Sequence, residues 1–150
     1  MTIAAYKAYF ENYKVVIPVI KEVKFITHGK DLIRNFDNIS ENQLLIVFLP
    51  KASTNARNTN NISLEWNNLL LILTKIDNED ITDETQTTDQ DATLDTAKLI
   101  MQQLLDDSED YTSGCSMWNE IDPNSFDLEF DLNYKGWQGW VIGFNHQIGL

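Results

Sequence analysis

The stretch Phe126-Asp-Leu-Glu-Phe-Asp-Leu132 carries the strongest fold signal in this chain of 150 residues. Apolar and acidic residues alternate strictly along it. Because successive side chains of a strand point to opposite faces of a sheet, this alternation predicts an antiparallel strand. One face of that strand is expected to lie against a core and the other in water.

The residues after this strand predict its hairpin partner. Residues 133–139 contain two glycines and are expected to form the turn. The final strand is then expected to place every second residue on one face, namely Trp140, Ile142, Phe144, His146 and Ile148. A histidine in that pattern is expected to be a buried residue of the core or of the strand end.

A second hairpin is expected earlier in the chain. The continuous apolar run Leu44–Leu49, closed by Pro50, predicts a buried strand. Residues 64–76 predict the next strand, because alternating residues lead into another apolar run. The small polar residues between them, 52–61, have no periodicity and are expected to form a loop.

Helices are expected around these strands. Thr2 is a suitable N-cap for the first helix, Pro18 is expected to end it, and its apolar face is formed by Ile3, Tyr6, Phe10 and Tyr13. A short extended piece is expected at residues 23–27. A second, short helix is expected at residues 29–36.

The third helix has the strongest amphipathic pattern in the chain. We expect it to begin near Ala92, with Asp91 or Thr93 as its cap, and to end at the acidic run 106–110. Its apolar stripe is formed by Leu94, Ala97, Ile100, Met101, Leu104 and Leu105.

Together these elements predict a single α+β domain spanning residues 1–150. We expect an antiparallel sheet of about four strands, arranged as two hairpins. Two to three helices are expected on one face of that sheet, in the order ααββαββ.

The charge of the chain is concentrated in one segment. The formal net charge is −12, and residues 77–110 hold twelve acidic residues against one lysine. We expect residues 77–91 to be a solvated loop whose carboxylates form an acidic surface, made of Asp77, Glu79, Asp80, Asp83, Glu84, Asp89 and Asp91. This segment is not expected to bind a nucleic-acid backbone, since that binding requires basic residues.

No catalytic motif is present, so we expect a protein that is not an enzyme and needs no cofactor. The single Cys115 precludes an intrachain disulfide and fits a reducing compartment or one in which oxidation has no effect on the fold. No local motif places His28 or His146 beside it, as a Cys–His dyad would require.

The acidic segment also invites comparison with calcium loops. Asp89, Asp91, Thr93 and Asp95 stand at alternate positions. However, leucine and isoleucine occupy the positions where an EF-hand needs glycine and glutamate, which excludes that motif. No metal site is therefore expected, and loose cation binding by clustered carboxylates stays open as an alternative.

The pair Trp137 and Trp140 has two interpretations. The two rings are either a platform for a sugar or a partner, or packing residues at the end of the last hairpin. Packing is the commoner role of tryptophan at such a place and is the expected one.

Neither a signal peptide nor a membrane span is expected. The first residues lack a basic region followed by a long apolar one. The longest apolar runs, 44–49 and 69–73, are far shorter than the roughly 20 residues of a spanning helix. We expect a protein made in the cytoplasm, with no membrane partner.

Three stretches of the chain together suggest a family. They are the aromatic helix Tyr6–Phe10 with Phe25-Ile and Asp31-Leu-Ile after it, the strand Leu69–Leu73 with the acidic connection and helix 95–105 after it, and the ending Gly139-Trp-Val-Ile-Gly-Phe144. In these stretches the chain resembles the tail-terminator or tail-completion proteins of tailed phages, especially those of Bacteroidetes phages and prophages. Val141 stands where that family usually has arginine, and residues 77–91 are longer and more acidic than usual.

The resemblance implies a virion structural protein at the head-proximal end of a tail, made in the host cytoplasm. Such a protein forms a ring, for which the resemblance favours a hexamer, and it caps the tail tube and joins it to the capsid connector. Its partners would be the tail-tube and connector proteins. The loop 52–61 would contact neighbouring subunits, through Thr54, Asn55, Arg57 and Asn58.

The charge pattern favours an alternative from another class. An acidic protein-binding module, perhaps a DNA mimic that inhibits a nucleic-acid-binding protein, would also present a segment of this kind. Mimics of that kind spread their charge over the whole molecule, whereas this chain confines it to one segment.

Overall fold

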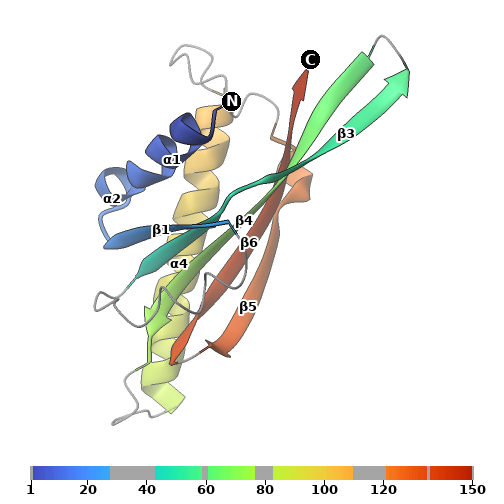
Figure 1. Ribbon diagram of the computed structural model, residues 1–150. Helices are drawn as coiled ribbons and strands as arrows, with labels where there is room; N and C mark the ends of the chain where they lie inside the picture. The colour runs from blue at the N-terminus through green and yellow to red at the C-terminus, as the bar shows by residue number, and fades with distance from the viewer. Residues whose placement is uncertain are drawn as a thin grey trace.

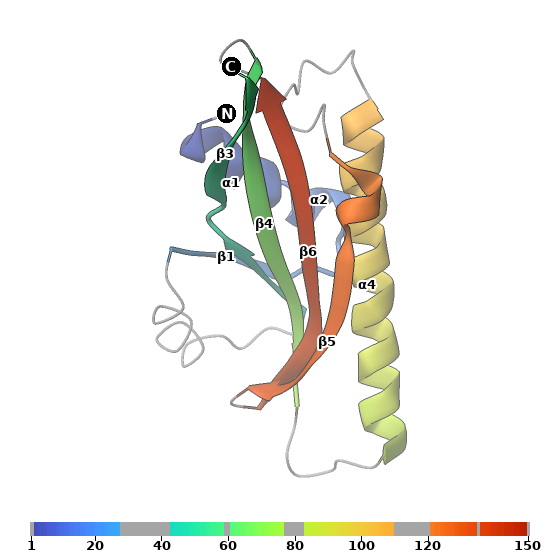
Figure 2. The same cartoon turned by 90° about the vertical axis from the view of Figure 1, so that its right-hand side faces the viewer.

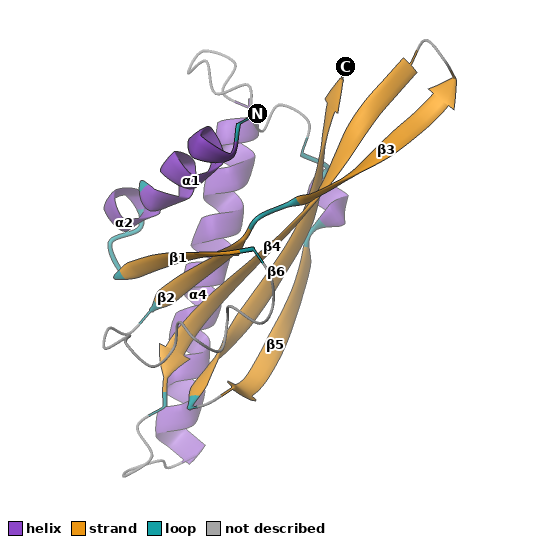
Figure 3. Cartoon of the chain, in the orientation of Figure 1, coloured by secondary structure: helices purple, strands orange, loops and turns teal. Residues whose placement is uncertain are grey.

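The computed structural model describes residues 2–27, 43–58, 61–76, 83–109, 121–134 and 136–149. These residues form one mixed sheet with helices against it (Figures 1 and 3). The elements in chain order are α1 (Ile3–Glu11), α2 (Tyr13–Val16), β1 (Glu22–Ile26), β2 (Leu44–Phe48), β3 (Lys51–Asn58), β4 (Asn61–Lys75), α4 (Asp83–Glu109), a 3-10 helix (Pro123–Ser125), β5 (Asp127–Tyr134) and β6 (Trp137–Gly149).

The sheet contains more strands than the sequence predicts. Five strands follow one another in the order β1-β2-β4-β6-β5, and β3 also pairs with β4. The short extended piece predicted at residues 23–27 is β1, and it pairs with β2 in parallel. The prediction of an antiparallel sheet of about four strands is therefore wrong in strand number and in this one pairing, although the other pairings are antiparallel.

The predicted loop at residues 52–61 is largely a strand. β2 pairs with β4 from Leu44 opposite Leu73, and β3 continues along the same edge of β4 from Lys51 opposite Asn67. The residues of β3 are small and polar and have weak intrinsic strand preference. Their pairing with β4 supplies the hydrogen bonds that local sequence does not predict, so the hairpin is longer than expected.

The last hairpin confirms the strongest sequence signal. β5 pairs antiparallel with β6 from Asp127 opposite Gly143 to Tyr134 opposite Trp137. β6 begins at Trp137, within the predicted turn, and Gly136 at the turn has a φ of 80° that favours glycine. On the predicted apolar face, Ile142, Phe144 and His146 are buried.

The first helix is confirmed where it begins, but it ends at Glu11 instead of at Pro18, and Tyr13 lies in the separate helix α2. The Thr2 side chain caps α1 by accepting a hydrogen bond from the backbone N–H of Ala5 at 3.2 Å. Tyr6, Phe10 and Tyr13 are buried as predicted, whereas Ile3 is 45% exposed, so its predicted burial is wrong. The helix predicted at residues 29–36 lies outside the described residues.

The acidic helix begins nine residues earlier than predicted. α4 starts at Asp83, so much of the predicted solvated loop is helical. Acidic residues in the first turn interact favourably with the helix dipole. The threonines weaken the helical pattern in the sequence, but their hydroxyl groups form hydrogen bonds with carbonyl groups of the helix. Thr93, for example, is buried and donates to the carbonyl of Asp89 at 2.9 Å rather than capping the helix.

The core lies on both faces of the sheet. The described helices cover one face, where α4 runs along the sheet and α1 lies beside it (Figure 2). We call the core on this face the helix-side cluster, which includes Tyr6, Phe10, Tyr13, Leu45, Val47, Leu70, Ile72, Ala97, Ile100, Leu104, Ile142 and Phe144. The far-side cluster on the opposite face contains Ile26, Leu44, Ile46, Leu71, Leu73 and Trp137. Burial on both faces explains why β2 and the middle of β4 are continuous apolar runs.

Candidate functional site

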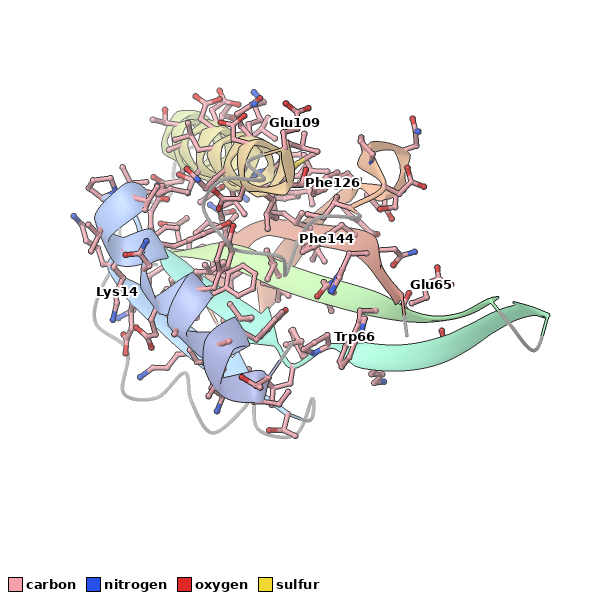
Figure 4. The ribbon with its side chains drawn as sticks, turned by 90° about the horizontal axis from the view of Figure 1, so that it is seen from above. Lys14, Glu65, Trp66, Glu109, Phe126 and Phe144 are labelled. Carbon is pink, nitrogen blue, oxygen red and sulfur yellow. The ribbon has the colours of Figure 1, made fainter. Side chains whose placement is uncertain are left out.

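The most prominent surface feature is a long hairpin arm. We define the arm as β3 together with residues 61–67 of β4, and it projects away from the helices in two views (Figures 1 and 4). β6 pairs with the other edge of β4 as far as Gly149 opposite Ser63. Among the described strands, none pairs with the outer edge of β3.

The residues predicted to contact neighbouring subunits all lie on this arm. Thr54 and Asn55 stand opposite Leu64 and Ser63, and Asn58 stands opposite Asn61. Arg57 lies at a register shift of the hairpin. The four residues therefore lie on a paired strand instead of the predicted loop.

A buried polar cluster lies at the base of the arm. The Tyr6 hydroxyl of α1 donates to Asn68 Oδ1 of β4 at 3.3 Å. Asn68 Nδ2 lies 2.9 Å from His146 Nδ1 of β6 and 3.2 Å from the carbonyl oxygens of Trp66 and Phe144, and its two N–H groups are shared among these three acceptors. This cluster ties α1 to β4 and β6, the two strands that support the arm.

His146 is a neutral structural residue in this cluster. It is 1% exposed, and burial lowers its pKa from 6.5 to about 4. Because Asn68 Nδ2 can only donate, the contact is satisfied by the tautomer of the neutral ring in which Nδ1 accepts. Trp66 stacks against it with the ring planes 10° apart. The prediction of a core histidine is confirmed, whereas the role of Asn68 was missed; its sequence signal is a polar residue that opens the apolar run of β4.

A second polar network joins the helices. The Tyr9 hydroxyl donates to Asp107 Oδ2 of α4 at 2.6 Å and lies 2.9 Å from the Tyr13 hydroxyl. Burial, more than these neighbours, raises the pKa of Tyr9 above its ordinary value, so the phenol stays protonated and able to donate. Gln103 donates to the other oxygen of Asp107 at 2.9 Å. This carboxylate therefore belongs to the packing of α1 on α4, not to a free acidic surface.

The predicted acidic surface is only partly described. Asp77, Glu79 and Asp80 lie outside the described residues, and Asp83 and Glu84 form the first turn of α4. Asp89 is half-buried on α4, and Asp91 is exposed.

The solvent-facing side of α4 carries an acidic stripe that extends beyond the predicted surface. Its exposed members follow helical spacing and are Asp91, Asp95, Lys98, Gln102, Asp106 and Glu109. Lys98 pairs with Asp95 at 3.0 Å and is itself exposed, so the stripe keeps a net negative charge. Glu109 lies on the side of α4 turned away from the sheet (Figure 4).

The helix also separates the alternating carboxylates that resemble a calcium loop. On α4, residues two apart are rotated by about 200°, so Asp89 and Asp91 face opposite sides, and only Asp91 and Asp95 share the acidic stripe. Within the residues that the structure describes, no group of three or more His, Cys, Asp or Glu side chains is placed to hold a metal ion. Cys115 and His28 lie outside those residues.

The two tryptophans of the last hairpin do not form a platform. Trp137 is buried in the far-side cluster, whereas Trp140 packs against the helix-side cluster on the opposite face of the sheet. The Trp140 indole N–H donates to the carbonyl of Gln90 at 3.1 Å. An odd spacing of three along a strand puts the two rings on different faces, so the expected packing role is confirmed.

Neither a protein-family model nor a curated protein matches this chain. In the part of the chain that the structure describes, none of the helices combines the length and the apolar composition of a membrane span.

Proposed function

We propose that this protein is a phage virion structural protein, a ring-forming tail terminator or head–tail joining protein. In this role it caps the head-proximal end of the tail tube and connects the tube to the capsid connector. Its activity is assembly, and each subunit contacts its neighbours through the arm. The proposal rests on the resemblance of three stretches of the sequence and on one structural observation, which is the arm itself.

The arm supports an assembly role because of its length and its open edge. β3 has eight residues, and an outer edge that no described strand covers offers its backbone N–H and C=O groups to another strand. Exposed edges are commonly protected in monomeric proteins, since they promote association. The buried cluster of Tyr6, Asn68 and His146 fixes the base of the arm, which suits a rigid contact element.

The acidic stripe on α4 is compatible with a ring in which the stripes of neighbouring subunits do not contact one another. Identical stripes repel one another, so in a ring the stripes are expected to face solvent, the lumen or a basic patch on a different protein. A ring structure in which the stripes of neighbouring subunits face each other would contradict this part of the proposal.

The function is tested with tail tubes. Purified protein is added to tubes polymerised from the tail-tube protein of the same genome, and the ends are imaged by electron microscopy. We expect a ring at one end of each tube and no binding along the length. A protein that leaves both tube ends bare, at concentrations where the tubes are intact, would refute the proposal.

A matched variant identifies the arm as the contact element. Deleting Asn55 and Ala56 of β3 together with their partners Ile62 and Ser63 shortens the arm by two facing pairs and preserves the alternation of the rest. We expect a folded protein, with an unchanged circular dichroism spectrum, that no longer forms end rings. Normal rings from this variant would remove the arm from the proposal.

The acidic stripe favours a second candidate, an acidic protein-binding module that occupies a nucleic-acid-binding partner. Four exposed carboxylates along one helix face provide a surface that a basic groove can contact. Charge reversal of two of them, Asp91→Lys and Asp106→Lys, should abolish capture of such a partner, and binding should weaken steeply with added salt. Unchanged capping of tubes by the same variant would instead support the first function.

A further inference from the structure

We propose that β3 opens from β4 as a unit of its own, and that the hydroxyl of Tyr6 on α1 is the latch that holds the base of β3 closed. The device lies within one subunit, so the inference goes beyond the proposed function and can be measured without a ring. It rests on the pairing of β4, on the residues of β3 and on the contacts of Tyr6.

The pairing of β4 is interrupted on one edge only. On the edge shared by β2 and β3, the partners change from Val47 opposite Leu70 to Lys51 opposite Asn67. Three residues, 48–50, therefore face two residues of β4, which makes a β-bulge. On the other edge, β6 pairs with β4 without interruption along the whole arm and the sheet below it. β3 can therefore separate from β4 while β4 stays paired with β6.

The bulge also separates the support of β2 from that of β3. The Leu49 N–H donates to the carbonyl oxygen of Ile26 in β1 at 2.9 Å, so the chain stays joined to β1 as far as Leu49. The next residue, Pro50, has no N–H to donate. Opening of β3 can therefore begin at Pro50 without loss of the pairing between β1 and β2.

The residues of β3 provide little burial that would hold the strand closed. Alanines at positions 52 and 56 are the only apolar residues of Lys51–Asn58. Among the described strands, none pairs with the outer edge of β3. A segment that buries little apolar surface opens at a lower free-energy cost than the core does. Pairing with β4 is therefore the main interaction that closes β3.

The Tyr6 hydroxyl lies at the bulge and contacts both of its sides. It is 3.4 Å from the carbonyl oxygen of Phe48 at the end of β2 and 3.3 Å from Asn68 Oδ1 of β4. Tyr6 is buried, and burial raises the pKa of its phenol above the ordinary value, so the hydroxyl keeps its proton. This proton is shared between the strand that leads into β3 and the strand on which β3 closes. Tyr6 is therefore a positioning residue of the arm.

The separate opening is tested by hydrogen exchange of the native subunit, read at those β3 amides that donate to β4, which alternate along the strand. In wild type, these amides should exchange roughly tenfold or more faster than the central amides of β4 and β6. Their exchange should also depend less on added urea, because opening β3 exposes less surface than global unfolding does. An equal urea dependence at β3 and in the central strands would overturn the inference, whether or not any variant folds.

The latch is tested with Tyr6→Phe, which keeps the aromatic ring and removes the hydroxyl. Because opening of β3 breaks the contacts of that hydroxyl, exchange at β3 should become about three- to tenfold faster. Tyr13→Phe is the matched control, since Tyr13 is also buried and its hydroxyl lies 2.9 Å from that of Tyr9, in the network that joins the helices. A contact that survives the opening of β3 affects global unfolding alone. Tyr13→Phe should therefore speed exchange in the central strands and leave β3 unchanged.

The pattern across the two variants decides the role of Tyr6. Faster exchange at β3 in Tyr6→Phe but not in Tyr13→Phe supports the latch. Unchanged exchange at β3 in Tyr6→Phe would show that Tyr6 stabilises the core alone, and an equal acceleration at β3 in Tyr13→Phe would show a general loosening; either result overturns the latch. These readouts do not involve tail tubes, so failure of the proposed function is recognised separately.

Discussion

A methyl group added at Gly139 tests a close backbone approach between β6 and β4. Gly139 of β6 pairs with Leu73 of β4 and is buried, and a Cβ atom built on it falls 1.9 Å from the carbonyl oxygen of Ile72. Real Cβ atoms essentially never come closer than 3.0 Å to such atoms, so one strand must move by about 1.1 Å, the difference between these distances. The obstacle is backbone, and no side chain can rotate away to relieve it.

We expect Gly139→Ala to destabilise the protein by about 3 kcal/mol, at the upper end of the usual cost of overpacking a core. For a chain of this length, that loss lowers the melting temperature by roughly 6–12 °C. Urea unfolding followed by circular dichroism measures the free energy, and thermal unfolding gives the second value. The cost arises because β4 and β6 are the two longest strands and separating them locally disturbs both core clusters.

Gly143→Ala is the matched control on the same strand. The nearest atom to its built Cβ is Asp127 Cβ at 3.8 Å, which is an ordinary contact. Because glycine is unfavourable within a strand, this variant should be neutral or more stable by about 0.5–1 kcal/mol. If the two variants differ by less than about 1 kcal/mol, the close approach at Gly139 does not constrain the fold and the reasoning fails.

Three further predictions concern the buried polar groups. Asn68→Ala leaves several buried partners without a hydrogen bond and should lower the free energy of unfolding, measured in urea, by about 2–4 kcal/mol. Asn67→Ala, at the exposed neighbouring position, is the control and should change it by less than about 0.5 kcal/mol. Because burial lowers the pKa of His146 to about 4, the unfolded chain binds this proton more readily, and the unfolding free energy should rise by up to about 3 kcal/mol between pH 4 and pH 6.5. An equal slope in His146→Gln would assign that pH dependence to other groups. Tyr9→Phe removes the hydrogen bond to Asp107 and should cost about 1–2 kcal/mol, and an unchanged urea midpoint would show that this bond does not stabilise the packing of α1 on α4.

The elements with strong periodicity were predictable because their local pattern and their tertiary environment agree. The alternation at 126–132 has the same period as the pleat of β5, and the stripe of Ile100 and Leu104 has the period of a helix that covers one sheet face. The cap at Thr2 depends only on the next three residues. These features were predicted correctly from the sequence.

The candidate site was less predictable, because its residues have weak local preferences. β3 is a strand because it pairs with β4, and nothing in its own small polar residues indicates this. The early start of α4 depends on threonine hydroxyls that donate to carbonyl groups of the helix, such as that of Thr93. The low helix propensity of threonine hides this start in the sequence. The contact of Asn68 with His146 joins residues 78 positions apart, beyond the reach of any local pattern.

The sequence alone determined the class of the strongly periodic elements, most of their buried faces and the location of the negative charge, since each follows from residue type and period. The tertiary structure decided which strands are neighbours and how far the arm extends. These depend on pairings between distant segments, whose hydrogen bonds are made by backbone groups common to all residues. Strand order is therefore a property of the folded chain that no single segment encodes.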